Sequence, residues 1–192
     1  ITSDALGPKC AARIFATGHI PKEQAKSLGL EDLRTVYAVS PGVAGQTGIE
    51  GAQFLKSLCQ SLSVSALIAV DALAARDMAR LGSTVQITDT GISPGSGVGN
   101  PRKEYTKESI GVPVIAVGVP TVIHILHAAA SIFDQKITQE SEKRANRYQE
   151  AVVTVRDADA LIRHAAALTA MAINLALHPS LSASELSHLT AR

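Results

Sequence analysis

Two aspartates are the residues of this chain whose types and positions best suit chemistry. Asp71 directly follows the apolar run at 67–70, and Asp4 stands just ahead of a segment with helical periodicity. Two carboxyl groups brought close together cannot both ionise, so one becomes an acid and the other a base. Such a pair can activate water, as in aspartic-type peptidases. Aspartate is also a common helix N-cap, so capping is an alternative role for both residues.

A third aspartate, Asp89, follows the β-rich run at 84–88 and opens a glycine-rich loop. The loop fits no dinucleotide or Walker pattern, because no helix directly follows its glycines. Backbone N–H groups of such a loop can hold phosphate, which is a lesser alternative. We expect this loop and the loop at 40–48 to flank a substrate cleft. The candidate contact residues are Gly45, Thr47, Asp89, Gly95, Ser96 and Gly97.

A metal site is the rival interpretation of the aspartates. His124 and His127 lie three residues apart. A transition metal could be bound by Asp4, Asp71 and His124, since carboxylate and imidazole together suit such ions. Cys10 and Cys59 fall on apolar faces of expected helices and are interpreted as core. No Gly-x-Ser-x-Gly elbow is present, which disfavours a serine hydrolase of that type. We expect no cofactor.

The elements that must position these residues alternate along the chain. Strands are expected at 34–39, 65–70, 84–88, 114–117 and 152–155, with Gly118 and Pro120 ending the fourth. Helices are expected at 5–15, 49–62, 72–81, 121–133, 158–177 and 182–190, and the helix at 158–177 is apolar enough to be buried on nearly every face. This order predicts the α/β class, with a doubly wound, largely parallel sheet and helices on both faces. Asp71 and Asp89 would then lie at carboxyl ends of strands, where such sheets bind ligands.

The composition narrows the class of protein. At 192 residues the chain is expected to be a single domain, 1–192. The net charge of +1, the 3% aromatic content and the absence of Trp argue against direct nucleic-acid binding. No run of ~20 apolar residues or signal peptide is apparent, so we expect no membrane contact and a cytoplasmic location.

Several blocks resemble the spore germination endopeptidase family, in the family's order and over nearly the whole chain. They are Asp4-Ala-Leu-Gly-Pro-Lys9, Ser40-Pro-Gly-Val-Ala-Gly-Gln-Thr-Gly-Ile-Glu50, Ala69-Val-Asp-Ala-Leu-Ala-Ala-Arg76, Gln86-Ile-Thr-Asp-Thr-Gly-Ile-Ser-Pro-Gly-Ser-Gly-Val-Gly-Asn100, Gly111-Val-Pro-Val-Ile-Ala-Val-Gly-Val-Pro-Thr121 and Ile173-Asn-Leu-Ala-Leu-His-Pro179.

The resemblance implies an atypical aspartic endopeptidase that degrades small acid-soluble spore proteins during germination, in the cytoplasm of the spore core. Family members are made as zymogens, assemble as homotetramers and have a fold similar to hydrogenase maturation endopeptidases. Their two catalytic aspartates match Asp4 and Asp71. The family has a strand just before the first aspartate, so this chain is expected to lack an N-terminal strand and a pro-segment. A metal-dependent maturation peptidase and a non-enzymatic regulatory or assembly protein are the alternatives.

Overall fold

The computed structural model describes residues 5–27, 29–30, 32–42, 44–95, 102–145, 148 and 151–190. The chain divides into two compact units. The first comprises Ile1–Leu6 and Pro41–Ile162, and the second comprises Gly7–Ser40 and Arg163–Arg192. The candidate site lies in the first unit, so this unit is described first.

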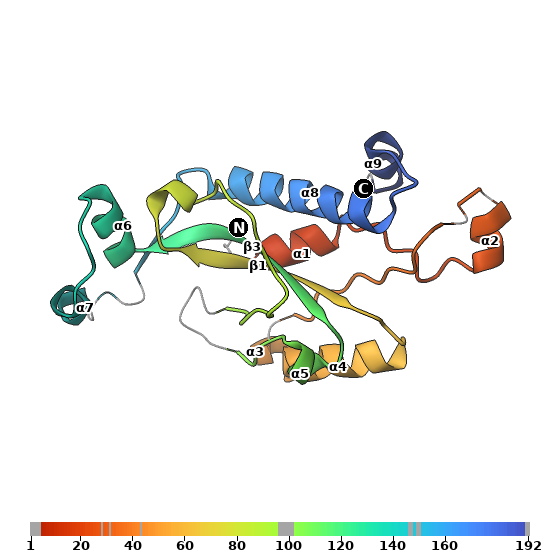
Figure 1. Ribbon diagram of the computed structural model, residues 1–192, viewed down its shortest axis with the longest axis horizontal. Helices are drawn as coiled ribbons and strands as arrows, with labels where there is room; N and C mark the ends of the chain where they lie inside the picture. Colours follow the sequence, from red (N-terminus) through yellow and green to blue (C-terminus); the bar gives the residue numbers. More distant parts are fainter. Residues whose placement is uncertain are drawn as a thin grey trace. The chain divides into compact units, whose positions relative to one another are not determined.

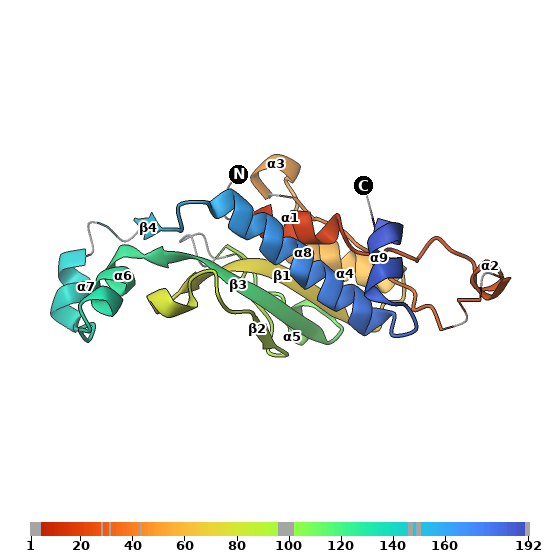
Figure 2. The ribbon, with the colours of Figure 1, turned by 90° about the horizontal axis from the view of Figure 1, so that it is seen from above.

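A four-stranded sheet forms the centre of the first unit. Strand β3 (Val114–His124) lies between β1 (Leu67–Ala75) and β2 (Gln86–Thr88), and the two-residue β4 (Val152–Val153) pairs with the end of β3 (Figures 1 and 2). Strands β1 and β3 are parallel, whereas β2 and β4 run antiparallel to β3. The protein is therefore of the mixed α/β class with a mixed sheet, and the doubly wound, largely parallel arrangement is not confirmed.

Strand β1 is longer than the sequence indicates. It runs through Asp71 to Ala75, in register with β3 from Leu67 opposite Val114 to Ala75 opposite Ile123. The expected helix at 72–81 is wrong: only the short 3₁₀ helix η2 (Met78–Arg80) forms there. The segment has good helix formers, but pairing with a buried central strand outweighs this weak local preference.

Strand β3 likewise continues past the residues expected to stop it. Gly118 and Pro120 both lie inside it, and its side chains are buried at nearly every position. The register moves from Leu73 opposite Pro120 to Ala74 opposite Val122, which leaves Thr121 as a bulge. Proline lacks an N–H group, and a bulge is one of the few places where a strand tolerates it.

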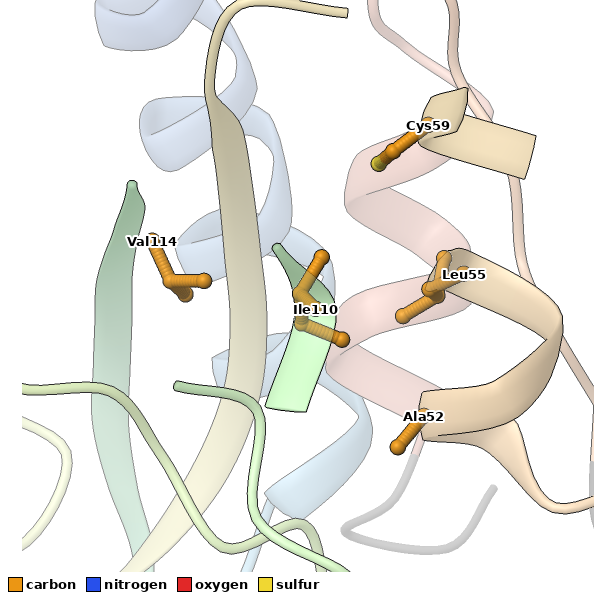
Figure 3. Close-up of a cluster of buried hydrophobic side chains, with 5 residues drawn as sticks. All are labelled: Ala52, Leu55, Cys59, Ile110 and Val114. Atoms are coloured by element: carbon orange, nitrogen blue, oxygen red, sulfur yellow. The ribbon is translucent and has the colours of Figure 1, made fainter. Parts of the chain in front are cut away.

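Helix α4 (Gly51–Ser61) confirms the helix expected at 49–62 and supplies the main core of this unit. Its buried residues Ala52, Leu55 and Cys59 recur at helical spacing. In Figure 3 these side chains point from one side of α4 toward Ile110 and Val114, with which they form a cluster. Leu67 and Ala69 of β1 pack against the same cluster, so α4 covers one face of the β1–β3 pair.

Shorter elements complete the first unit. They are α3 (Ala44–Thr47), α5 (Lys107–Ile110), α6 (Ile125–Ile132) and α7 (Gln139–Ala145). The helix expected at 121–133 is thus confirmed only from Ile125 onward, because β3 occupies its first residues. A second cluster, Ala75, Ile123 and Ala128, joins β1, β3 and α6.

The second unit is helical among its described residues. It holds α2 (Lys22–Ser27), α9 (Ala183–Thr190) and most of α1 (Leu6–Ala11) and α8 (Ala158–Leu177). The strand expected at 34–39 does not form. Instead, the Val36 carbonyl accepts hydrogen bonds from the N–H groups of Thr17 and Gly18, and its own N–H donates to Thr17 Oγ1.

Helix α8 has the expected bounds, and Asp157 caps it by accepting a 2.9 Å hydrogen bond from the Ala160 N–H. The expectation that it is buried on nearly every face is wrong, since Leu168 is 66% exposed. By length and composition alone, α8 is also long and apolar enough to span a membrane. The sequence interpretation finds no apolar segment of that length. The core helix of a soluble protein can pass the same test, so this finding is weak evidence.

Candidate active site

Asp71 lies in the middle of β1 and is partly buried. Side chains along a strand alternate between its two faces, so Asp71 projects to the same face as Leu67 and Ala69, the face that α4 covers. It does not cap a helix, because the strand continues to Ala75 and Asp77 caps η2 through a 2.9 Å bond from the Ala79 N–H. The capping alternative for Asp71 is therefore wrong.

The glycine-rich loop reaches Asp71. The backbone N–H of Gly95 donates a 3.3 Å hydrogen bond to Asp71 Oδ2. Gly95 has a φ of 74°, a left-handed conformation that glycine adopts without strain. An N–H aimed at a carboxylate stabilises its charged form. Of the candidate cleft residues, Gly95 is thus placed beside the candidate catalytic carboxylate.

Tyr105 holds the other side of this loop in place. It forms a bridge with Ile92: the Ile92 N–H donates to the Tyr105 carbonyl at 3.1 Å, and the Tyr105 N–H donates to the Ile92 carbonyl at 2.8 Å. Gly91, with φ of 100°, passes so close to the Tyr105 carbonyl that a Cβ there would overlap it. The ring of Tyr105 packs against the α4 core cluster.

The Tyr105 hydroxyl lies over the first residue of α4. An added Cβ at Gly51 would overlap the hydroxyl oxygen. Burial raises the pKa of Tyr105, the negative charges of Glu50 and Asp71 raise it further, and Arg102 opposes them. The phenol therefore remains a protonated hydrogen-bond donor at neutral pH.

Glu50 stands at the N-cap of α4, yet its side chain makes no capping hydrogen bond. Its Oε1 atom is buried and has no hydrogen-bond partner among the described residues. The sequence interpretation assigned no role to Glu50 or Tyr105. The signal available for Glu50 was its place at the end of the block 40–50 that carries part of the resemblance. For Tyr105 the signal was the scarcity of aromatic residues, which make up 3% of the chain.

The remaining residues that the sequence predicts for the site lie in different parts of the chain, and some are outside its described part. Asp4, Ser96 and Gly97 lie outside the described residues. Gly45 and Thr47 belong to the short helix α3, where Thr47 Oγ1 accepts a 3.2 Å hydrogen bond from the Ile49 N–H. Asp89 follows β2, as expected, and is exposed. The structure thus brings Gly95 to Asp71 and leaves the other cleft assignments as predictions.

His124 lies far from Asp71 along the sheet. Asp71 is opposite Gly118, and His124 is six residues further along β3, which corresponds to about 20 Å at ~3.3 Å per residue. The two side chains therefore cannot bind one ion, and the rival metal site is not supported. Among the described residues, no cluster of three or more His, Cys, Asp or Glu side chains suits a metal.

His124 instead lines a separate hollow of about 310 Å³. Its lining includes Ile125, Leu126, His127, Glu142, Ala145 and Tyr148. Burial lowers the pKa of His127, as do the positive charges of His124 and Arg76, while Glu142 opposes them.

Both cysteines are free and buried, which confirms their assignment to the core. Burial raises the pKa of Cys10 to about 11, although Arg13 opposes the change. Burial also raises the pKa of Cys59. Since the thiolate is the reactive form, neither residue suits a nucleophile.

A protein-family model described as germination protease matches residues 1–140. This chain belongs to the germination protease family. Germination protease of Caldanaerobacter subterraneus subsp. tengcongensis is 40% identical over 215 residues, which cover 98% of this chain and 66% of the relative. The protein of that name from Clostridium acetobutylicum is 37% identical, over 97% of this chain and 64% of the relative.

A third germination protease, from Bacillus mycoides, is 47% identical over 134 residues, which cover 70% of this chain and 36% of the relative. The chain therefore spans about two thirds of the length of the family members that it matches throughout. The alignment with the Caldanaerobacter protein runs over 215 positions, more than the 192 residues here, so that relative has residues with no counterpart in this chain.

Proposed function

We propose that this chain is an aspartic-type endopeptidase of spore germination that cleaves small acid-soluble spore proteins. Family membership supports a germination protease, and the resemblance of the Asp4 and Asp71 blocks to the family's catalytic blocks supports the two aspartates as the catalytic pair. The observation that carries the assignment for Asp71 is its position. It is a partly buried carboxylate in mid-strand that caps no helix and accepts a hydrogen bond from a glycine loop.

In the proposed mechanism, one of the two carboxyl groups is protonated and the other is ionised. The carboxylate removes a proton from a water molecule, whose oxygen attacks the scissile carbonyl carbon, while the neutral carboxyl protonates the carbonyl oxygen. As the C–N bond breaks, the newly protonated carboxyl gives its proton to the leaving amine, and the other carboxylate takes back a proton from a hydroxyl of the tetrahedral intermediate. Because the two groups share a proton, they titrate as a unit.

An activity assay with a purified small acid-soluble spore protein tests the assignment. Asp71→Asn is expected to lower kcat/KM at least ~100-fold, because general acid–base catalysis typically contributes ~100- to 10,000-fold. Asp134→Asn is the matched control: this exposed residue lies outside the candidate site, and its φ of 49° suits asparagine. Wild-type activity in Asp71→Asn would overturn the proposal.

A chelator separates this mechanism from a metal-dependent peptidase. Cleavage by the wild-type chain is expected to survive EDTA, whereas loss of activity that an added transition metal restores would favour the metal alternative. A wild-type chain that neither binds nor cleaves the spore protein would favour the non-enzymatic alternative.

The same resemblance leads us to propose that the protein arises from a zymogen, forms homotetramers and acts in the cytoplasm of the spore core. Light scattering of the purified protein tests the assembly directly. A mass of four chains is expected, and a monomer at micromolar concentration would contradict it.

A further inference from the structure

We propose that Tyr105 is a substrate-contacting residue of this site, whose hydroxyl donates a hydrogen bond to a main-chain carbonyl of an extended peptide bound beside Asp71. The inference rests on the proposed function and deepens it, because it assigns part of peptide recognition to a residue that the sequence interpretation did not include.

The position of Tyr105 is fixed on three sides. Its backbone is paired with Ile92 by two hydrogen bonds, and its ring packs against the core cluster beneath α4. Gly91 and Gly51 allow the close approach, because a Cβ on either would overlap an atom of Tyr105. A donor whose place is set before the substrate arrives loses little conformational entropy on binding.

Core packing explains the ring of Tyr105 but not its hydroxyl. The hydroxyl makes no hydrogen bond to a described residue; it lies against Gly51 at the α4 N-terminus, where the charges of Glu50 and Asp71 act on it. A phenylalanine would fill the same space without an unpaired donor. Among the described residues, the hydroxyl is not one of the buried polar atoms that lack a partner, so it stays open to solvent and can donate to a substrate carbonyl.

Glu50 supplies the complementary half of the contact. It precedes Gly51, against which the Tyr105 hydroxyl lies, and its buried Oε1 lacks a partner among the described residues. A peptide unit offers one C=O acceptor and one N–H donor. A phenol donor with a carboxylate acceptor nearby matches that pair, so the geometry points to the main chain of a peptide as the ligand.

A double-mutant cycle on thermal unfolding tests the placement without requiring activity. Gly51→Ala is expected to lower Tm in the wild-type background, because the new Cβ displaces the Tyr105 hydroxyl. In a Tyr105→Phe background, the ring atoms nearest to the new Cβ at position 51 would be Cζ at 3.4 Å and Cε1 at 3.7 Å, which are close to ordinary contacts. In that background Gly51→Ala should therefore leave Tm unchanged or raise it. An equal loss in both backgrounds would overturn the placement.

Cleavage of a small acid-soluble spore protein tests the role. Tyr105→Phe is expected to keep the wild-type Tm and lower kcat/KM about 10-fold or more, the effect of one lost hydrogen bond to substrate. The matched control is Tyr37→Phe, which removes a hydroxyl from a tyrosine that also packs on a glycine, Gly18, in the other unit. Its activity should equal that of the wild type.

The outcomes distinguish this inference from the proposed function. An active wild type with a fully active Tyr105→Phe variant would overturn the role of Tyr105 and leave the role of Asp71 standing. A wild-type chain that does not cleave the spore protein would overturn both.

Discussion

Asp71 and Gly118 are register partners in the parallel β1–β3 pair. Side chains of paired residues project to the same face, so a side chain at 118 would stand beside the Asp71 carboxylate. The space is instead taken by Leu73, whose side chain a Cβ at 118 would overlap. A glycine in the central strand, which usually weakens a sheet, thus makes room on the face that carries the candidate catalytic residue.

Gly118→Ala is therefore expected to destabilise the protein by about 1–3 kcal/mol, the usual cost of overpacking a filled interior. Urea unfolding measures the change. Leu73→Ala in the same background should recover part of the loss, because it removes the overlapping atoms. As a control, Gly45→Ala adds a Cβ with no atom within 4 Å and should change stability by no more than about 0.5 kcal/mol. A neutral Gly118→Ala would contradict the described packing.

Asn174 is expected to be one of the most sensitive positions in the second unit. Its fully buried side chain accepts a 2.9 Å hydrogen bond from the Phe15 N–H and donates a 3.0 Å bond to the Arg13 carbonyl. Asn174→Ala leaves both backbone groups without these partners, which should cost about 2–4 kcal/mol. Chemical denaturation gives the value, and exposed Ser184→Ala serves as a control. A loss below about 0.5 kcal/mol would show that the two bonds do not hold this segment.

His178 should make stability depend on pH. It is fully buried, and it contacts the Phe15 ring edge-on at 5.4 Å. Burial lowers its pKa; the backbone of Phe15 opposes this change, and the positive charge of Arg34 adds to it.

The folded state therefore binds a proton on His178 less readily than the unfolded state does. Stability is fully present above the unfolded pKa of about 6.5 and falls as the pH drops from there, with a slope of at most about 1.4 kcal/mol per pH unit. Unfolding free energies between pH 8 and pH 5 measure the slope. His178→Leu should flatten it, while the exposed His188→Gln should not. An unchanged slope in His178→Leu would contradict this account.

Local sequence signals predicted two of the helices closely. The bounds of α8 were predicted from its long apolar run and those of α4 from its apolar residues, because both signals are local. The lengths of β1 and β3 could not be read in the same way. Their continuation through Ala75 and Pro120 depends on pairing with each other and on the Thr121 bulge, which are contacts between distant segments.

The site was predictable in part for the same reason. The Asp71 block carried the family resemblance, so Asp71 could be proposed from the sequence, but its mid-strand position could not be predicted. Gly95 forms a hydrogen bond to Asp71, and its predicted place beside a substrate cleft stays a prediction. Tyr105 and Glu50 come together at the α4 N-terminus through the Ile92 bridge and the start of α4, an arrangement that the spacing of residues does not reveal.

The most direct test of the central claim is the distance between the carboxyl groups of Asp4 and Asp71 in a high-resolution crystal structure of the protein. A dyad that shares a proton and activates water predicts carboxyl oxygens within hydrogen-bond reach, about 2.6–3.2 Å, or joined through one water molecule. A separation of about 10 Å or more would contradict the assignment of these two aspartates as a catalytic pair.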